Sequence, residues 1–280
     1  MSSSDFYWPL PNGMKLFAQE WNHADPTRGV VCLVHGLGEH SGRYAHVAEY
    51  LNQHGFAFLS FDLRGHGKSD GRRGHIDAYD TYLEDIDRLI QEARQRHPGL
   101  PVFLYGHSLG GNLVIYYALK RKPQINGVIS TGPITYTEIP PVKMLLGKFF
   151  YKIMPTFTMN NGLDHNGLSR DPSVVAKYNS DPLVHPLISA RLGLDMLNSG
   201  KWITENAHEL SLPLLIMEGS ADRLVSVEGT RELARKSPAR FITYKEWEGG
   251  YHELHNDIIK ADVLEFMEKW MEERLKIISA

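Results

Sequence analysis

Residues 102–111 read VFLYGHSLGG, and this stretch sets the architecture of the chain. Four apolar residues predict a buried strand, which runs directly into a glycine-rich turn at 106–110 and then into a segment of helical character at 112–119. The turn forces Ser108 into a strained backbone conformation, so Gly106 and Gly110 are needed where a Cβ would collide with the neighbouring strand and helix. Ser108 is thereby expected in a cleft at the amino end of a helix, where a developing negative charge is favoured.

Short apolar strands alternate with helices along most of the chain. Two antiparallel edge strands are expected first, at 5–8 and 14–21, joined through a turn with Asn12 and Gly13 at its tip. This order predicts an α/β protein with a mostly parallel central sheet flanked by helices and with ligands at the carboxyl ends of its strands. Further strands are expected at 30–34, 56–61, 102–105, 127–131, 214–217 and 241–244, and helices at 44–53, 79–96, 112–119 and from about 257 onward.

The alternation is broken between Thr131 and Leu214. About 80 residues separate these two strands, far beyond a usual connection, so residues 134–210 are expected to form a helical cap inserted after the sixth strand of a single domain, 1–280. Within it, residues 142–154 are densely apolar, contain three lysines and have no acidic residue. The segment is interpreted either as a cap helix packed on the catalytic domain or as a helix that lines an acyl pocket or touches a lipid surface.

The composition is that of an ordinary soluble protein. Hydrophobic residues make up 42% and charged residues 22% of 280 residues, and the formal net charge of −3 gives no bulk attraction to nucleic acid or anionic lipid. The first residues lack the basic segment and apolar core of a secretory signal, and no run of about 18 apolar residues occurs, which favours a cytoplasmic location. The one cysteine, Cys32, lies in an apolar strand and is expected in the core.

A serine nucleophile needs a histidine base and an acid that holds this histidine in the right tautomer. In a strand-turn-helix arrangement of this kind the order along the chain is Ser, then Asp or Glu, then His, each on a loop at the end of a later strand. The loop after the strand at 214–217 contains Asp222, and the loop after the strand at 241–244 contains His252 and His255. His252 follows Gly249-Gly250-Tyr251, where the glycines permit a tight loop, and is predicted as the base in preference to His255. Asp222 is predicted as the acid, in competition with Glu218, Asp164, Asp181 and Asp195.

The tetrahedral intermediate needs two backbone N–H donors. One comes from the residue after the nucleophile and one from an early strand-end loop. These donors are predicted to be Leu109 and Leu37. His35 and His107 flank these positions and are interpreted as packing or loop-shaping residues.

Four segments together resemble the monoacylglycerol lipase and lysophospholipase group of α/β-hydrolases. They are residues 35–44 (HGLGEHSGRY), 106–111 (GHSLGG), 219–222 (GSAD) and 251–255 (YHELH). The resemblance covers nearly the whole chain, and the first segment is much more specific than G-x-S-x-G alone. It implies the α/β-hydrolase fold and a serine ester hydrolase. Cap sequences vary in such enzymes, so the resemblance implies no preference for acyl length.

The resemblance also implies roles for Glu39, Arg43 and His255. They match positions that line the glycerol end of the pocket in monoacylglycerol lipases, where two free hydroxyls need donors and acceptors. The alternative is a structural salt bridge between Glu39 and Arg43, which are spaced i and i+4.

The predicted function is hydrolysis of monoacylglycerols to fatty acid and glycerol through an acyl-enzyme on Ser108. The closest alternative is a lysophospholipase or broad carboxylesterase, which shares the catalytic residues. A noncatalytic ligand-binding α/β-hydrolase would be expected to lack one of the three residues Ser108, Asp222 and His252, and all three are present in this sequence. The chemistry requires no metal or organic cofactor. The expected partner is a lipid ester, with transient contact between the cap and a membrane or micelle, and neither nucleic acid nor an obligate protein partner is expected.

Overall fold

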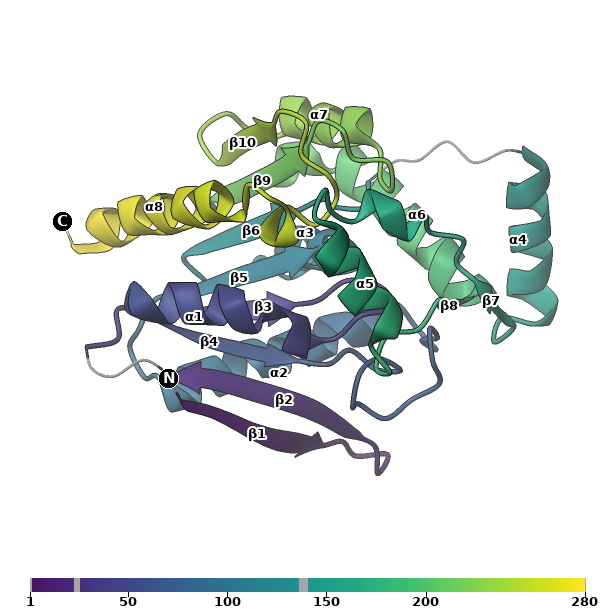
Figure 1. The fold of residues 1–280 in the computed structure, drawn as a ribbon, viewed down its shortest axis with the longest axis horizontal. Coiled ribbons are helices and arrows are strands. Elements are labelled where there is room, and N and C mark those ends of the chain that lie inside the picture. Colours follow the sequence, from purple (N-terminus) through teal and green to yellow (C-terminus); the bar gives the residue numbers. More distant parts are fainter. Residues whose placement is uncertain (1, 23–25, 136–140, 280) are drawn as a thin grey trace.

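The computed structural model describes residues 2–22, 26–135 and 141–279, which form a central sheet of eight strands between layers of helices (Figure 1). The strands are β1 (Ser2–Pro9), β2 (Lys15–Asn22), β3 (Gly29–Val34), β4 (Phe56–Phe61), β5 (Val102–His107), β6 (Gly127–Thr131), β9 (Leu214–Gly219) and β10 (Ile242–Trp247). Their order in the sheet is β1-β2-β4-β3-β5-β6-β9-β10. β2 pairs antiparallel with β1 and β4, and the other neighbours pair parallel, so the predicted mostly parallel sheet is confirmed.

Helices cover both faces of this sheet (Figure 1). One face carries α1 (Ala45–Gln53) and α8 (Lys260–Ser279), and the other carries α2 (Asp80–Arg96), α3 (Leu109–Arg121) and α7 (Val227–Lys236). β3 supplies buried side chains to both layers: Val30, Cys32 and Val34 to one, and Val31 and Leu33 to the other. A strand buried on both faces has no polar side, which explains its unbroken apolar sequence. Each fully buried Val or Leu contributes about 1.5–3 kcal/mol.

The strand order places a crevice at the carboxyl end of the sheet. β4 lies on one side of β3, whereas β5, β6, β9 and β10 are added successively on the other side. The order therefore reverses between β3 and β5, and loops at such a reversal separate and leave room for a ligand. The loop after β3 contains Leu37, and the turn after β5 contains Ser108.

The insertion between β6 and β9 contains three helices and a small sheet. Its elements are α4 (Pro141–Ile153), β7 (Thr158–Asn160), α5 (Pro172–Ser180), β8 (Leu187–Ser189) and α6 (Ala190–Glu205). The helix predicted at 142–154 is present as α4, whereas the antiparallel pair of β7 and β8 was not predicted. We call residues 141–210 the cap; residues 136–140 of the predicted insertion lie outside the described residues. α4 lies at the margin of the molecule beside α6 (Figure 1).

Element boundaries differ from the predicted ones by a few residues. The final strand is shifted and longer, at Ile242–Trp247, and the last helix begins at Lys260 because Leu254–Asn256 forms a separate 3₁₀ turn. None of the helices in the described ranges is both long and apolar enough to cross a bilayer.

Candidate active site

Ser108 occupies a sharp turn between β5 and α3. Its φ of +55° and ψ of −115° lie in a region that residues with a side chain rarely adopt. Two glycines make room for the turn. A Cβ on Gly106 would lie 2.2 Å from the Gly110 carbonyl oxygen, and a Cβ on Gly110 would lie 1.9 Å from that of Val34. Ser108 is partly exposed and immediately precedes α3, so its side chain is reachable at the positive end of that helix.

Asp222 and His252 meet from the loops that follow β9 and β10. Asp222 Oδ2 lies 2.6 Å from His252 Nδ1. Asp222 Oδ1 accepts hydrogen bonds from the backbone N–H groups of Leu224 (2.7 Å) and Val225 (3.1 Å). The Asp222 side chain is 0% exposed and that of His252 5%. Since a carboxylate only accepts, Nδ1 is the protonated ring nitrogen, and Nε2 remains free to take a proton.

Electrostatics support this division of roles. Burial favours the neutral imidazole, but the Asp222 carboxylate outweighs it and raises the pKa of His252 above its usual value. Burial likewise opposes ionisation of Asp222, yet His252 and two backbone N–H groups lower the pKa of Asp222 below its usual value. Asp222 is thus an anion beside His252, and an anion in this position favours the protonated form of the imidazole.

Three other acids that competed with Asp222 lie in the cap and have different partners. Asp181 lies 2.9 Å from His40, Asp195 accepts a hydrogen bond from the Tyr151 hydroxyl at 3.0 Å, and Asp164 caps the 3₁₀ turn at 165–167. None of these three carboxylates contacts His252 among the described residues, so the placement of Asp222 on the strand-end loop distinguishes it from them.

Ser108 and His252 line one small pocket with a volume of about 20 Å³. Glu39 and Glu253 form part of its polar wall, and four leucines also belong to its lining. Ligand pockets usually hold about 300–1,000 Å³, so the described conformation is narrow for a lipid ester. The remaining lining residues are Gly36, Leu37, His107, Leu163, Leu168, Tyr178 and Leu224.

The backbone amides of Leu37 and Leu109 flank Ser108. Within the described part of the chain, neither amide donates a hydrogen bond to another residue, so both can serve an anionic oxygen. A Cβ on Gly36 would lie 3.3 Å from the Ser108 Cβ, so glycine allows the loop after β3 to approach Ser108 closely. The cap holds this loop in place, because the His185 N–H donates to the Gly38 carbonyl at 2.9 Å.

Arg43 joins two buried carboxylates. It lies 2.5 Å from Glu39 Oε2 and 2.7 Å from each oxygen of Glu253. Burial opposes ionisation, but Arg43 outweighs it and lowers the pKa of both Glu39 and Glu253. Glu39 Oε1 also accepts from the Gly36 N–H (2.6 Å) and the Tyr44 hydroxyl (2.7 Å). The salt bridge that the spacing of Glu39 and Arg43 allowed is therefore present. The second pair, between Arg43 and Glu253, connects this segment to the loop of His252.

The three residues assigned to the glycerol end differ in position. Glu39 lines the Ser108 pocket, whereas Arg43 and His255 are not among its lining residues. His255 is fully buried and stacks on Tyr44, with ring centroids 4.6 Å apart. Their roles in substrate binding stay predictions. Sequence reasoning missed Glu253, whose only sequence signal is its position next to His252.

His107 and His35 have the packing roles that were expected. Both are buried, and burial lowers the pKa of His107 to about 4. His107 lies between the rings of His252 and His255, at 4.7 and 4.8 Å, and its Nδ1 contacts Thr131 Oγ1 at 3.1 Å. His35 contacts the Gly36 carbonyl and the Leu63 N–H.

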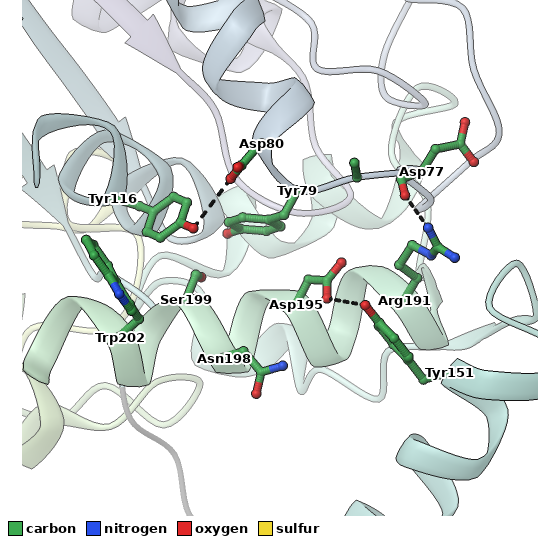
Figure 2. A pocket seen from close by; sticks show the side chains of 11 residues that line it. Asp77, Tyr79, Asp80, Tyr116, Tyr151, Arg191, Asp195, Asn198, Ser199 and Trp202 are labelled. Carbon is green, nitrogen blue, oxygen red and sulfur yellow. Dashed lines mark hydrogen bonds between the residues drawn. The ribbon is translucent and has the colours of Figure 1, made fainter. Parts of the chain in front are cut away.

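A larger hollow of about 450 Å³ lies between α6 and the start of α2 (Figure 2), and Ser108 is not among its lining residues. Its charged groups are already engaged: Tyr116 donates to Asp80 at 3.4 Å, Tyr151 donates to Asp195 at 3.0 Å, and Arg191 donates to the Asp77 carbonyl. None of its lining residues lines the Ser108 pocket. The larger hollow is therefore separate from the pocket of Ser108 and His252.

Comparisons with known proteins identify the family of the chain. The family model described as "Serine aminopeptidase, S33" matches residues 25–259. A monoacylglycerol lipase of Mycolicibacterium smegmatis is 34% identical over 262 residues, which cover 92% of this chain and 93% of that protein. A monoglyceride lipase of Rattus norvegicus is 31% identical over 285 residues, and the match covers 98% of this chain and 94% of that protein.

A solved structure is also similar. The crystal structure of a monoacylglycerol lipase from Paleococcus ferrophilus has a TM-score of 0.84 and 37% sequence identity, and the match covers 92% of this chain and 99% of that chain. The chain therefore belongs to the serine aminopeptidase S33 family and, within it, to the monoacylglycerol lipase and lysophospholipase group of serine α/β-hydrolases.

Proposed function

We propose that this protein hydrolyses monoacylglycerols to a fatty acid and glycerol, with Ser108 as nucleophile, His252 as general base and Asp222 as the residue that orients His252. One observation carries the proposal. The Asp222–His252 pair, joined at 2.6 Å, opens onto the same pocket as Ser108, whose backbone is strained at φ +55°. A serine hydroxyl is a weak nucleophile and needs such an adjacent base.

In the first half of the reaction, His252 Nε2 takes the Ser108 hydroxyl proton while Ser108 Oγ attacks the ester carbonyl carbon. The carbonyl oxygen becomes an oxyanion, which the N–H groups of Leu37 and Leu109 stabilise. When the intermediate collapses, the ester C–O bond breaks and the imidazolium gives its proton to the departing glycerol oxygen. The fatty acyl group is then bound to Ser108 as an ester.

In the second half, water replaces glycerol as the reactant. His252 takes a proton from water, the resulting hydroxide attacks the acyl carbonyl, and the same two amides hold the oxyanion. Collapse breaks the bond to Ser108 Oγ, which recovers its proton from His252. Fatty acid leaves, and the protein returns to its starting state.

Two features support a monoacylglycerol as substrate. The relatives named monoacylglycerol or monoglyceride lipase share most of the chain's length. The pocket also has a polar side, where Glu39 and Glu253 can accept hydrogen bonds from two hydroxyls, and an apolar side formed by leucines from the cap and the loop after β9. A site built to pair hydroxyls rejects a substrate without them more strongly than an apolar site rejects one methylene.

Hydrolysis of four lipids with the same acyl chain tests this proposal: a monoacylglycerol, a diacylglycerol, a triacylglycerol and a lysophospholipid. We expect kcat/KM to be highest for the monoacylglycerol, because its two free hydroxyls match the polar wall. The fatty acid released would be measured with each lipid in the same detergent. A higher kcat/KM for the lysophospholipid would replace monoacylglycerol hydrolysis with lysophospholipase activity, and no release from any lipid would refute both.

We further propose that α4 touches the membrane or micelle that holds the substrate. Its sequence has no acidic residue, and Lys148 and Lys152 are exposed. Apolar side chains exposed beside lysines suit the boundary between lipid headgroups and acyl chains. The exposed apolar residues are Val142, Leu145, Leu146, Phe149 and Ile153, each more than half exposed.

The double variant Leu145→Ser, Phe149→Ser should bind vesicles of phosphatidylcholine and phosphatidylglycerol more weakly than the unchanged protein in a sedimentation assay. Each substitution removes apolar surface that lipid would bury. Burial of such surface stabilises the bound state by about 25 cal/mol per Å². Ile258→Ser is the matched control, because Ile258 is 64% exposed but lies outside the cap. Equal loss of binding in the control and in the double variant would reject a specific role for α4.

A further inference from the structure

Glu218 is a buried carboxyl group four residues before Asp222, the acid of the proposed triad. It lies at the end of β9 and is 0% exposed. Its Oε2 accepts a hydrogen bond from the Thr230 hydroxyl at 2.8 Å, and its Oε1 accepts from the Gly219 N–H at 3.2 Å. Its third partner is the Asp222 side chain. Two carboxyl groups can share a hydrogen bond only if one of them carries a proton.

The surroundings place that proton on Glu218. Asp222 accepts from His252 and from two backbone N–H groups, all of which favour its anion. Glu218 has no lysine or arginine partner among the described residues. Burial and the Asp222 charge raise the pKa of Glu218 well above its usual value.

The other charged and titratable groups near Glu218 do not change this assignment. Tyr244 on β10 faces it, but the Tyr244 hydroxyl donates to Glu246 at 2.8 Å. Arg231, which follows Thr230 on α7, pairs with both oxygens of Glu246, at 2.9 and 2.7 Å. Both groups are thus committed to Glu246.

Glu253 provides a contrast within the same protein. It is as deeply buried as Glu218, at 1% exposure, but Arg43 binds both of its oxygens and keeps it ionised. Two equally buried glutamates are therefore held in opposite protonation states by their partners. Glu253 is ionised and balances the positive charge of Arg43, whereas Glu218 must be neutral to lie beside the Asp222 anion.

We propose that Glu218 is a positioning residue that remains protonated and donates a hydrogen bond from its carboxyl O–H to Asp222, so that the Asp222 carboxylate is fixed for His252. This inference rests on the proposed function of the triad. Asp222 lies on a loop, and the hydrogen bonds from the backbone N–H groups of Leu224 and Val225 restrain only its Oδ1. A donor on rigid strand β9 adds a restraint from the body of the sheet and moderates the negative charge that acts on His252.

Two substitutions test the donor. Glu218→Gln keeps a donor in its amide and cannot ionise, so kcat on a soluble p-nitrophenyl ester and the acid limb of the kcat/KM profile against pH should both stay close to those of the unchanged protein. Glu218→Leu removes the donor and should lower kcat by about 10-fold to 100-fold, the range for loss of a hydrogen bond to a charged group. Its acid limb should move to higher pH, because an Asp222 with fewer donors holds the imidazolium more strongly.

The matched control is Glu20→Gln. Glu20 is another buried carboxylate, 3% exposed and paired with Arg96 and His97, but it lies on β2, far across the sheet from β9. Its replacement should lower the free energy of unfolding without moving the pH profile. Infrared difference spectra of the unchanged protein and Glu218→Gln should also show a protonated carboxylic acid C=O band only in the former, which tests the proton even if Glu218→Leu does not fold.

Three results would overturn the proposal: an acid limb that moves to lower pH in Glu218→Gln, which would mean that a negative charge had been removed; a missing carboxylic acid band; or unchanged kinetics in Glu218→Leu. Failure of the proposed function has a different signature. In that case the Ser108→Ala variant would keep the esterase activity of the unchanged protein, whatever the Glu218 variants do.

Discussion

Replacing Ser108 with alanine is expected to lower kcat by roughly 10³-fold to 10⁶-fold, the range found when a triad serine is removed. The reason is that Ser108 Oγ forms the bond to the acyl carbon, and the described pocket presents no other hydroxyl except the Tyr178 phenol beside Arg43. The fold should stay intact, because the backbone bonds of Ser108 to Thr131 and Asn112 do not involve its side chain. Steady-state hydrolysis of a p-nitrophenyl ester measures the effect, and the unfolding temperature measures the fold.

Alanine relieves no strain at φ +55°, so a small change in the unfolding temperature is compatible with this account. A loss of kcat below tenfold in a folded variant would remove Ser108 from the role of nucleophile.

Replacing Asp222 with asparagine should lower kcat on the order of 10⁴-fold, as the equivalent change does in serine proteases. An asparagine amide can present an N–H to His252 Nδ1, which then accepts, so Nε2 becomes the protonated nitrogen and cannot act as a base. The pH profile provides a second readout. His252 must be neutral to accept a proton, so activity falls as pH decreases through its pKa. Asp222 raises that pKa, so the acid limb should lie above that of an ordinary histidine and should move to lower pH in Asp222→Asn.

His255→Ala is the comparison for this variant, because His255 is the other histidine beyond Asp222 in the chain. It should be much milder, since His255 is packed between Tyr44 and His107 and has no contact with Asp222 in the described residues. If His255→Ala abolished turnover while His252→Ala retained it, the assignment of the base would be wrong.

The sheet could be predicted because its signals are local. Strands buried on both faces read as short apolar runs, as in β3 and β4, and the glycines at 106 and 110 are required by contacts shorter than 2.5 Å that any side chain would make. The meeting of Asp222 and His252 could also be anticipated, since the carboxyl ends of parallel strands β9 and β10 lie at one edge.

The carboxylate clusters could not be predicted, because their partners are distant in sequence. Arg43 and Glu253 are 210 residues apart, and no spacing rule links them. Glu218 was considered only as a rival of Asp222, since a sequence does not show that a glutamate at a strand end is buried without a cation. The pair β7 and β8 was missed for another reason: strands of three residues are too short to show an alternating pattern.

Mass spectrometry after treatment with a fluorophosphonate tests the central claim most directly, because this reagent forms a stable bond only with a serine that an adjacent base activates. Peptide mapping should find one label, on Ser108, and labelling should be slowed in Asp222→Asn and abolished in Ser108→Ala. A label on another serine of the intact protein, or equal labelling in Ser108→Ala, would contradict the assignment of Ser108, His252 and Asp222 as the catalytic groups.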